Sequence, residues 1–175
     1  MYRIVFFTLL IVAIVACSDK QLSNEKFVEP YKGPMMTAKN INTIYSDSGY
    51  KKVNLQAPLQ LLLQNNDREF PEGIYVEFFD KGKNPKAILT SNYAIFYKDK
   101  NLYKISGKVI VDNKDQGKKL STEELFWSPI NKKIYTDKHI LIETPNEIIE
   151  GNGLDADQDF SSYSIRNPIG IVSVK

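Results

Sequence analysis

Apolar and polar residues alternate with a period of two along most of the chain from residue 42 onward. Successive side chains of a β-strand point to opposite faces, so each alternating run predicts a strand with one buried face. Turn-forming clusters such as Asp99-Lys100-Asn101 and Pro129-Ile130-Asn131 separate the runs. The clearest predicted strands are residues 52–58, 73–80, 89–98, 103–112, 120–128, 133–143 and 146–156.

The leucine-rich stretch in residues 59–70 is the one place where the pattern resembles a helix. Pro58 and Pro71 flank it, and a predicted strand precedes it. Proline interrupts helical hydrogen bonding and favours extended backbone in the residue before it. We therefore predict that the β structure continues here, and we predict no helix longer than about two turns after the N-terminal segment.

An internal repeat supports a stack of hairpins. Residues 89–111 align with residues 120–142 at a constant offset of 31, so that Leu89 matches Leu120 and Phe96 matches Trp127. Each unit contains two long strands joined by a tight turn. The repeat predicts hairpins that pack side by side in one antiparallel arrangement.

The apolar positions of each repeat unit change parity near the middle of the first strand. The change falls between Ser91 and Ala94 in one unit and between Thr122 and Leu125 in the other. A β-bulge adds one residue to a strand and would keep all apolar side chains on one face. We therefore predict a bulge at each of these two points.

One face of each predicted strand is apolar and the other is polar, which is typical of antiparallel sheets. Two such sheets must cover each other, as in a sandwich, a jellyroll or an open barrel. The interior can be a filled core, or the sheets can stay parted and admit an apolar ligand; the pattern is compatible with both. The predicted inward positions are Val53, Leu55, Ala57, Ile74, Val76, Phe78, Ala94, Phe96, Ile105, Val109, Val111, Leu125, Trp127, Ile140, Ile142, Ile148, Leu154 and Ala156.

The N-terminus has the features of an export signal. Arg3 precedes an apolar run over residues 4–16, which is short for a membrane span but suits a signal-peptide core. Ile14-Val15-Ala16-Cys17 resembles a bacterial lipobox, which implies cleavage before Cys17 and lipidation of its sulfur. We therefore expect a signal peptide over residues 1–16, and a mature protein attached to a membrane outside the cytoplasm.

Composition bounds the mature chain. We expect residues 17–36 to be a lipidated tether and residues 37–175 to be one domain. Without Arg3, 22 basic residues face 21 acidic residues, which argues against nucleic acid as a partner. With the only cysteine acylated, no thiol remains for a disulfide.

The chain carries little material for a catalytic or metal site. His139 is the only histidine, and alternation places it on the solvated face. Asp155, Asp157 and Asp159 suggest a calcium loop, but Phe160 stands where such a loop needs glycine. We interpret these aspartates as a polar strand end, and we expect no enzyme, metal or cofactor.

The order of elements over residues 40–165 resembles the LptC family of lipopolysaccharide transport. The segments that carry the resemblance are residues 44–50, 70–80, 89–94, 106–109, 120–125 and 148–157. The resemblance implies a single twisted, open β-jellyroll whose parted sheets hold acyl chains. It also implies a periplasmic place at the inner membrane beside an ABC exporter. Relatives use an uncleaved transmembrane helix where this chain has a lipobox, which leaves any regulatory contact of such a helix in doubt.

The resemblance also suggests site residues. Acyl chains would lie against Val76, Phe78, Phe96, Val109, Val111, Trp127, Ile140 and Ile142. The exporter would meet the N-terminal strands at Val53, Leu55 and Ala57, and a soluble bridge protein of the same fold would meet Ile165, Ile169, Ile171 and Val174. The implied function is receipt of lipopolysaccharide from the exporter and its transfer to the bridge protein. The alternative is a structural envelope lipoprotein with a closed β-sandwich that binds other envelope proteins and no lipid.

Overall fold

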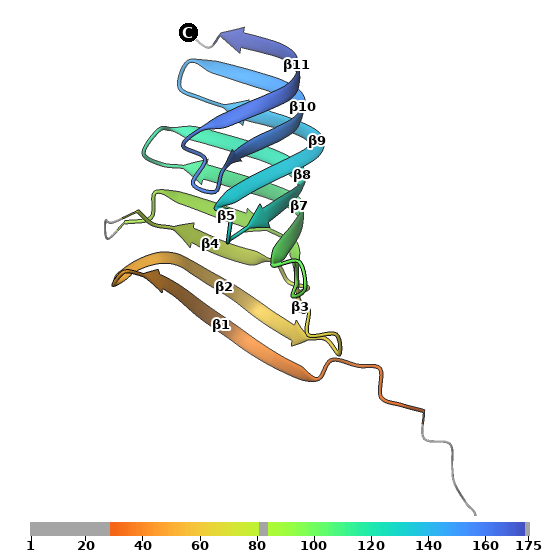
Figure 1. The fold of residues 1–175 in the computed structure, drawn as a ribbon. Coiled ribbons are helices and arrows are strands. Elements are labelled where there is room, and N and C mark those ends of the chain that lie inside the picture. Colours follow the sequence, from red (N-terminus) through yellow and green to blue (C-terminus); the bar gives the residue numbers. More distant parts are fainter. Residues whose placement is uncertain (1–28, 81–83, 174–175) are drawn as a thin grey trace, which may run out of the picture. The chain divides into compact units, whose positions relative to one another are not determined.

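The computed structural model describes residues 29–80 and 84–173, and its described part from Lys32 onward forms one compact unit (Figure 1). These residues contain eleven strands and no helix, so the predicted all-β fold is confirmed. All strand pairings are antiparallel. The strands are β1 (Met36–Asp47), β2 (Tyr50–Leu62), β3 (Arg68–Phe70), β4 (Ile74–Phe78), β5 (Ala87–Ser91), β6 (Tyr93–Tyr97), β7 (Leu102–Asn113), β8 (Lys118–Ser128), β9 (Lys133–Glu143), β10 (Glu147–Asp157) and β11 (Tyr163–Ser173).

The long strands β2 and β7 each pair with two short strands on the same side of the stack. The first half of β2 pairs with β4 and its end pairs with β3. The end of β7 pairs with β5 and its beginning pairs with β6. Since β4 pairs with β5 and β3 with β6, these six strands close a ring. The ring has two facing walls, and β7 contributes to both.

Strands β8 to β11 continue both walls beyond β7 in a twisted stack (Figure 1). The first wall comprises β4, β5 and the end of β7, followed by those halves of β8 to β11 that continue the pairing from the end of β7. The second wall comprises β3, β6 and the beginning of β7, followed by the other halves of β8 to β11, which continue the pairing from the beginning of β7. This arrangement, with β1 at one free edge and β11 at the other, is the open jellyroll that the family resemblance implies.

Bulges mark the corner where the long strands β7 to β10 cross from one wall to the other. The register shifts between Ser106 and Val109 on β7 and between Thr122 and Phe126 on β8. Gly107 takes a φ of 76° at the β7 corner, a left-handed conformation that glycine adopts at little cost. The bulge predicted between Thr122 and Leu125 is confirmed. The bulge predicted between Ser91 and Ala94 was wrong, because the strand ends at Ser91 and a new strand, β6, begins at Tyr93 after a break at Asn92.

Every residue predicted to face inward is buried except Ile148, which is only half-buried. Its neighbour Ile149 takes the inward position and is 7% exposed. The reason is another register shift, between Asn152 and Leu154 at Gly153, which reverses parity along β10. The prediction assumed one unbroken alternation from Ile148 to Ala156, and it was wrong at Ile148 for that reason.

Each predicted strand has a counterpart, although residues 89–98 form two strands, β5 and β6, and the alternating pattern missed two others, β1 and β11. Residues 59–70 form no helix, as predicted: β2 runs to Leu62, residues 63–67 form a turn, and β3 begins at Arg68. β1 was not among the predicted strands. It is exposed along most of its length, and only Ile41 packs against the core, so its sequence lacks the apolar face that marks the other strands.

Gly73 offers a test of the packing between the turn before β4 and the corner at Asn92. Its φ is +85°, and a Cβ there would overlap the backbone oxygen of Ser91. We expect Gly73→Ala to lower the free energy of unfolding by more than about 2 kcal/mol, because backbone strain and a clash with main chain add together. Urea denaturation measures the change.

Two glycines serve as controls. Gly49 has a φ of +80°, but a Cβ added there would have no atom within 4 Å, so Gly49→Ala should cost only the backbone term of about 1–2 kcal/mol. Gly170 has neither feature, and Gly170→Ala should stay within about 0.5 kcal/mol of the parent. Equal losses of stability for Gly73→Ala and Gly49→Ala would show that the close approach at Gly73 is unimportant.

Candidate functional site

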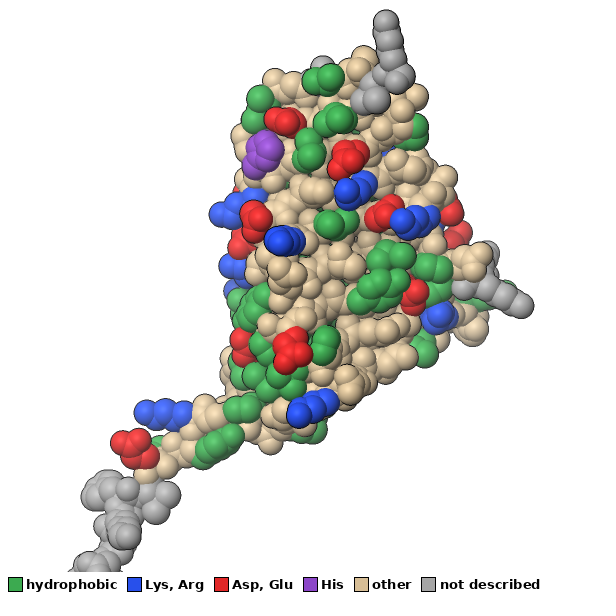
Figure 2. All heavy atoms as spheres, turned by 180° about the vertical axis from the view of Figure 1, so that it is seen from behind, with side chains coloured by type: hydrophobic (Ala, Val, Ile, Leu, Met, Phe, Trp, Pro, Cys, Tyr) green, Lys and Arg blue, Asp and Glu red, His purple; other side chains and the backbone are tan. Residues whose placement is uncertain are grey.

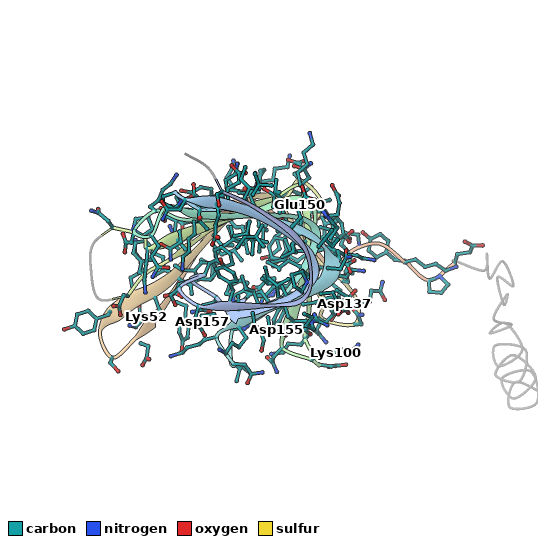
Figure 3. All side chains as sticks on the ribbon, turned by 90° about the horizontal axis from the view of Figure 1, so that it is seen from above. Lys52, Lys100, Asp137, Glu150, Asp155 and Asp157 are labelled. Carbon is teal, nitrogen blue, oxygen red and sulfur yellow. The ribbon has the colours of Figure 1, made fainter. Side chains whose placement is uncertain are left out.

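A cavity of about 790 Å³ opens between the walls near the N-terminal end of the stack. Side chains of β1 to β4 and of β6 to β8 line it, together with the ends of both walls and the turns after β8 and β10. This volume lies in the range of small-molecule and lipid-sized pockets. Viewed along the stack, the strands surround an interior into which many side chains point (Figure 3). The jellyroll is therefore partly open at one end, and it is packed farther along.

Five aromatic side chains form one side of the cavity. The ring of Tyr103 lies 4.7 Å from Trp127 and 4.7 Å from Phe96, centroid to centroid, and 6.3 Å from Phe70. Phe78 meets Trp127 edge to face at 5.3 Å. Phe78 belongs to the first wall and Trp127 to the second, so this contact joins the walls at the inner end of the cavity. All five are at most 7% exposed and present a continuous apolar surface.

Charged side chains of both signs line the outer part of the cavity. Arg68 lies over the ring of Phe96, with its guanidinium carbon 4.4 Å from the ring centroid. Lys52 donates a hydrogen bond to the backbone oxygen of Asp80. Figure 3 labels Lys52 and Asp157, and both residues border the cavity. An apolar interior with a charged entrance suits an amphiphile whose chain enters and whose polar group stays outside.

An ion pair closes the cavity on the side of the β10–β11 turn. Lys86 Nζ lies 2.8 Å from Asp159 Oδ2, and both side chains are about a quarter exposed. Burial raises the pKa of the Asp159 carboxyl, but hydrogen bonds from Lys86 and Ser161 outweigh burial, so that pKa lies below its ordinary value of 3.8. The bond to Asp159 raises the pKa of Lys86. Both groups are therefore charged at neutral pH.

Tyr103 is the one titratable group inside the aromatic cluster. Burial raises the pKa of its hydroxyl above the ordinary value of 10.0. It therefore stays neutral at physiological pH and contributes apolar surface to the cavity rather than a catalytic base.

The eight residues predicted to bind acyl chains all point into the interior, and none is more than 7% exposed. Phe78, Phe96 and Trp127 line the cavity. The other five are at most 1% exposed and pack inside the walls away from the cavity: Val76, Val109, Val111, Ile140 and Ile142. The structure thus brings three of the eight together at open space.

The residues predicted to contact the exporter lie on β2. Val53, Leu55 and Ala57 are at most 8% exposed, and Val53 and Leu55 line the cavity. β1 pairs with β2 along this stretch, so β2 has neighbours on both sides. The free edge at this end of the sheet is β1, whose residues Ile44 and Tyr45 are 57% and 60% exposed.

The residues predicted to contact the bridge protein lie on and after β11. Ile165 packs against the core, whereas Ile169 is 62% exposed. The backbone of Ile171 pairs with Ile149 of β10. Val174 lies outside the described residues, as do Cys17 and the predicted signal peptide.

Sequence reasoning missed several residues of the site. The alternation that identified Ile105 as an inward residue also predicts that Tyr103, two residues earlier on the same strand, faces inward. Phe70 stands in a segment that carried the family resemblance, but nothing in its own pattern marks it as inward. Phe160, which the sequence marks only as a mismatch to a calcium loop, is completely buried in a turn. A lone apolar residue between polar ones gives no periodic signal.

Of the polar residues interpreted as non-functional, His139 and Asp155 lie on the outside, whereas Asp157 and Asp159 border the cavity. His139 is exposed (purple in Figure 2), as predicted. Asp155 pairs with Arg166 on the outer surface, and Asp157 pairs with Lys133 at the border of the cavity. Among residues 29–80 and 84–173 there is no group of three acidic, histidine or cysteine side chains placed to hold a metal ion. In the same ranges there is no helix long and apolar enough to cross a membrane.

Comparison with known protein families identifies the relationship of this chain. The model of the family LptC, described as "Lipopolysaccharide-assembly, LptC-related", matches residues 4–164. A search of curated proteins found no match.

The ion pair between Lys86 and Asp159 predicts how stability depends on pH. A carboxyl whose pKa is lower in the folded state stabilises the fold above its unfolded pKa, and this contribution is lost as pH falls through the folded value. We expect Asp159→Asn to lower stability by up to about 1 kcal/mol at pH 7, since the pair is partly exposed. The deficit should shrink below about pH 4. Thermal unfolding of the parent protein and of Asp159→Asn between pH 3 and 7 measures the deficit in stability. A deficit that grows in acid would contradict the prediction.

Proposed function

This chain belongs to the LptC family, a periplasmic component of lipopolysaccharide transport, and we propose that it receives lipopolysaccharide from an inner-membrane ABC exporter and passes it to a bridge protein of the same fold. The observation that carries the proposal is the cavity, open at the β1 end and lined by aromatic side chains of both walls. A sealed interior would leave no place for an acyl chain.

Acyl chains would enter at the open end and lie against Phe78, Phe96 and Trp127. Removing a methylene from water contributes about 0.8 kcal/mol, so the binding energy would grow with the length of acyl chain inside the cavity. The five predicted residues deeper in the walls would contact the chain only where the walls separate to admit it. The phosphates of lipopolysaccharide would stay near Arg68 and Lys52, at the entrance.

The two free edges would join the chain to its neighbours. An edge strand presents unpaired backbone groups, and strand addition satisfies them through main-chain hydrogen bonds. β1 at one end and β11 at the other are the edges of this sheet. Following the family arrangement, we assign β1 to the exporter and β11 to the bridge protein, with exposed apolar side chains on both. On the face shown in Figure 2, hydrophobic side chains gather over the lower strands.

The lipidated Cys17 would hold the domain at the inner membrane. One acyl chain anchors a protein only reversibly, whereas two or more give stable attachment. Such an anchor replaces the tethering role of a transmembrane helix and leaves the jellyroll free to reach the exporter.

Photo-crosslinking in cells tests lipid occupancy of the cavity. We expect benzoylphenylalanine at Phe96 to form adducts with lipopolysaccharide, because this side chain lines the cavity. The matched control is the same probe at Tyr75, an aromatic position on β4 that is 37% exposed and does not line the cavity. Adducts at Phe96 but not at Tyr75 support transport. Adducts at neither position would favour the structural lipoprotein with a closed interior.

Lysine substitutions on the edges test partner assignment. A lysine on an edge strand opposes pairing because its charge would be buried against the incoming strand. We expect Val172→Lys, at a position that is 64% exposed on β11, to reduce recovery of the bridge protein at least several-fold. We expect Ile44→Lys on β1 to reduce recovery of the exporter instead. Tyr75→Lys, at a 37% exposed position on β4, which has a paired strand on each side, is the control and should reduce neither. Loss of the same partner in both edge variants would contradict the assignment.

A further inference from the structure

The turn between β10 and β11 enters the interior, unlike an ordinary hairpin turn. Phe160, in the middle of this turn, is 0% exposed and stacks on Tyr163 at 5.0 Å between centroids. By contrast, Ile130 in the turn between β8 and β9 is 70% exposed. We call residues 158–162 the strap. Its apolar side chain lies in the same cluster of buried residues that forms the core of the jellyroll.

Polar contacts attach the strap to both walls. Asp159 pairs with Lys86 of the first wall, and the backbone oxygen of Asp159 accepts a hydrogen bond of 2.8 Å from Asn113 Nδ2, at the end of β7. Gln158 Oε1 accepts a hydrogen bond of 3.0 Å from Trp127 Nε1 of the second wall. The strap itself connects two strands of the second wall. It therefore bridges the side of the jellyroll that lies opposite the corner, where no strand pairing among the described residues joins the two walls.

The strap also borders the cavity. Gln158, Asp159 and Ser161 line it, and Gln158 is bonded to the tryptophan of the aromatic cluster. The buried ring of Phe160 therefore lies directly behind residues that face the open space. An acyl chain that extends beyond the cavity between the walls meets the strap first.

We propose that the strap is a displaceable closure of the lipid groove, in which the Phe160 side chain occupies a position that an acyl chain takes when the walls open. This inference rests on the proposed function, because it needs lipid in the groove. A benzyl group and a hydrocarbon chain are both apolar, so one can replace the other without leaving the interior wet. Displacement of the strap would join the cavity to the part of the interior that is packed by aliphatic side chains.

The contacts of the strap fit reversible release. The side chains of Lys86 and Asp159 are about a quarter exposed, so water can solvate both ions as they separate. Phe160 has a φ of 55°, a left-handed conformation that is unfavourable for a bulky side chain. Strain of this kind persists only while surrounding contacts hold it, and release of the turn would relieve it.

The experiment uses the full chain in cells, with benzoylphenylalanine at Phe96 and the yield of lipopolysaccharide adduct as the readout. We expect Asp159→Asn to raise the yield about two- to fivefold, because the ion pair that holds the strap is lost. Phe160→Ala removes the competing side chain and should raise the yield further. The control is Glu124→Gln, which removes the ion pair between Glu124 and Lys104. This pair has a similar length, 2.9 Å, and similar exposure, but it lies near the corner, away from the strap. The control variant should leave the yield unchanged.

The outcomes separate the two hypotheses. A parent that forms adducts at a yield unchanged by Asp159→Asn and Phe160→Ala would overturn the strap and leave the transport function standing. A lower yield in Asp159→Asn, at equal protein abundance, would also overturn it, because the strap would then assist binding. No adduct in the parent or in either variant would overturn transport and the strap together. If Phe160→Ala fails to accumulate, Asp159→Asn decides alone.

Discussion

The long strands β7 to β10 each cover their own apolar face by folding back on themselves, and the rest of the structure depends on that constraint. A strand with one apolar face needs a second layer. Here the second layer is the other half of the same strand, reached through a corner at which the register shifts by one residue. Glu150 and Asp155 of β10 lie on opposite walls in Figure 3, with Asp137 of β9 near the corner. Backbone hydrogen bonds hold the strands in the stack, while side-chain packing and the polar bonds of the β10–β11 turn hold the walls together.

This division of forces explains why the groove can open. Ladder hydrogen bonds run between neighbouring strands along each wall, so the walls can part on the side opposite the corner without breaking them. The interactions that must yield are apolar, such as that of Phe78 with Trp127, or are the polar bonds of the β10–β11 turn. An acyl chain that enters between two apolar side chains offers each of them another apolar neighbour. The same fold therefore allows a stable scaffold and an exchangeable interior.

The sequence predicted most of the scaffold because alternation and burial follow from the same geometry. Six of the seven predicted strands, the bulge after Thr122 and nearly all buried faces could be read from period-two patterns, whereas residues 89–98 break into β5 and β6 at Asn92. The failures occur where that pattern carries no information. β1 has almost no buried face, and Ile148 lies before a register shift that the pattern does not show. The burial of Phe160 depends on interactions between residues up to 73 positions apart, which no local pattern encodes.

The location of the cavity follows from the type of side chain at each level of the stack. At the β1 end the walls carry large rings, which pack against one another in fixed geometries and leave space beside them. Farther along, Val111, Leu120 and Ile142 are all 0% exposed, and branched aliphatic side chains of this kind fill an interior to high density. The hydrophobic effect has no direction, so exchange of one apolar occupant for another does little to favour an open or a closed state.

Directional bonds must then decide between the open and the closed groove. Within residues 84–173, Asp159 accepts such bonds from Lys86 and Asn113, on the side of the jellyroll opposite the corner. Each of these bonds requires its donor and acceptor at one separation, and it weakens steeply once the walls move apart. A small change in binding energy therefore has its largest effect on the state of the groove at this ion-paired turn.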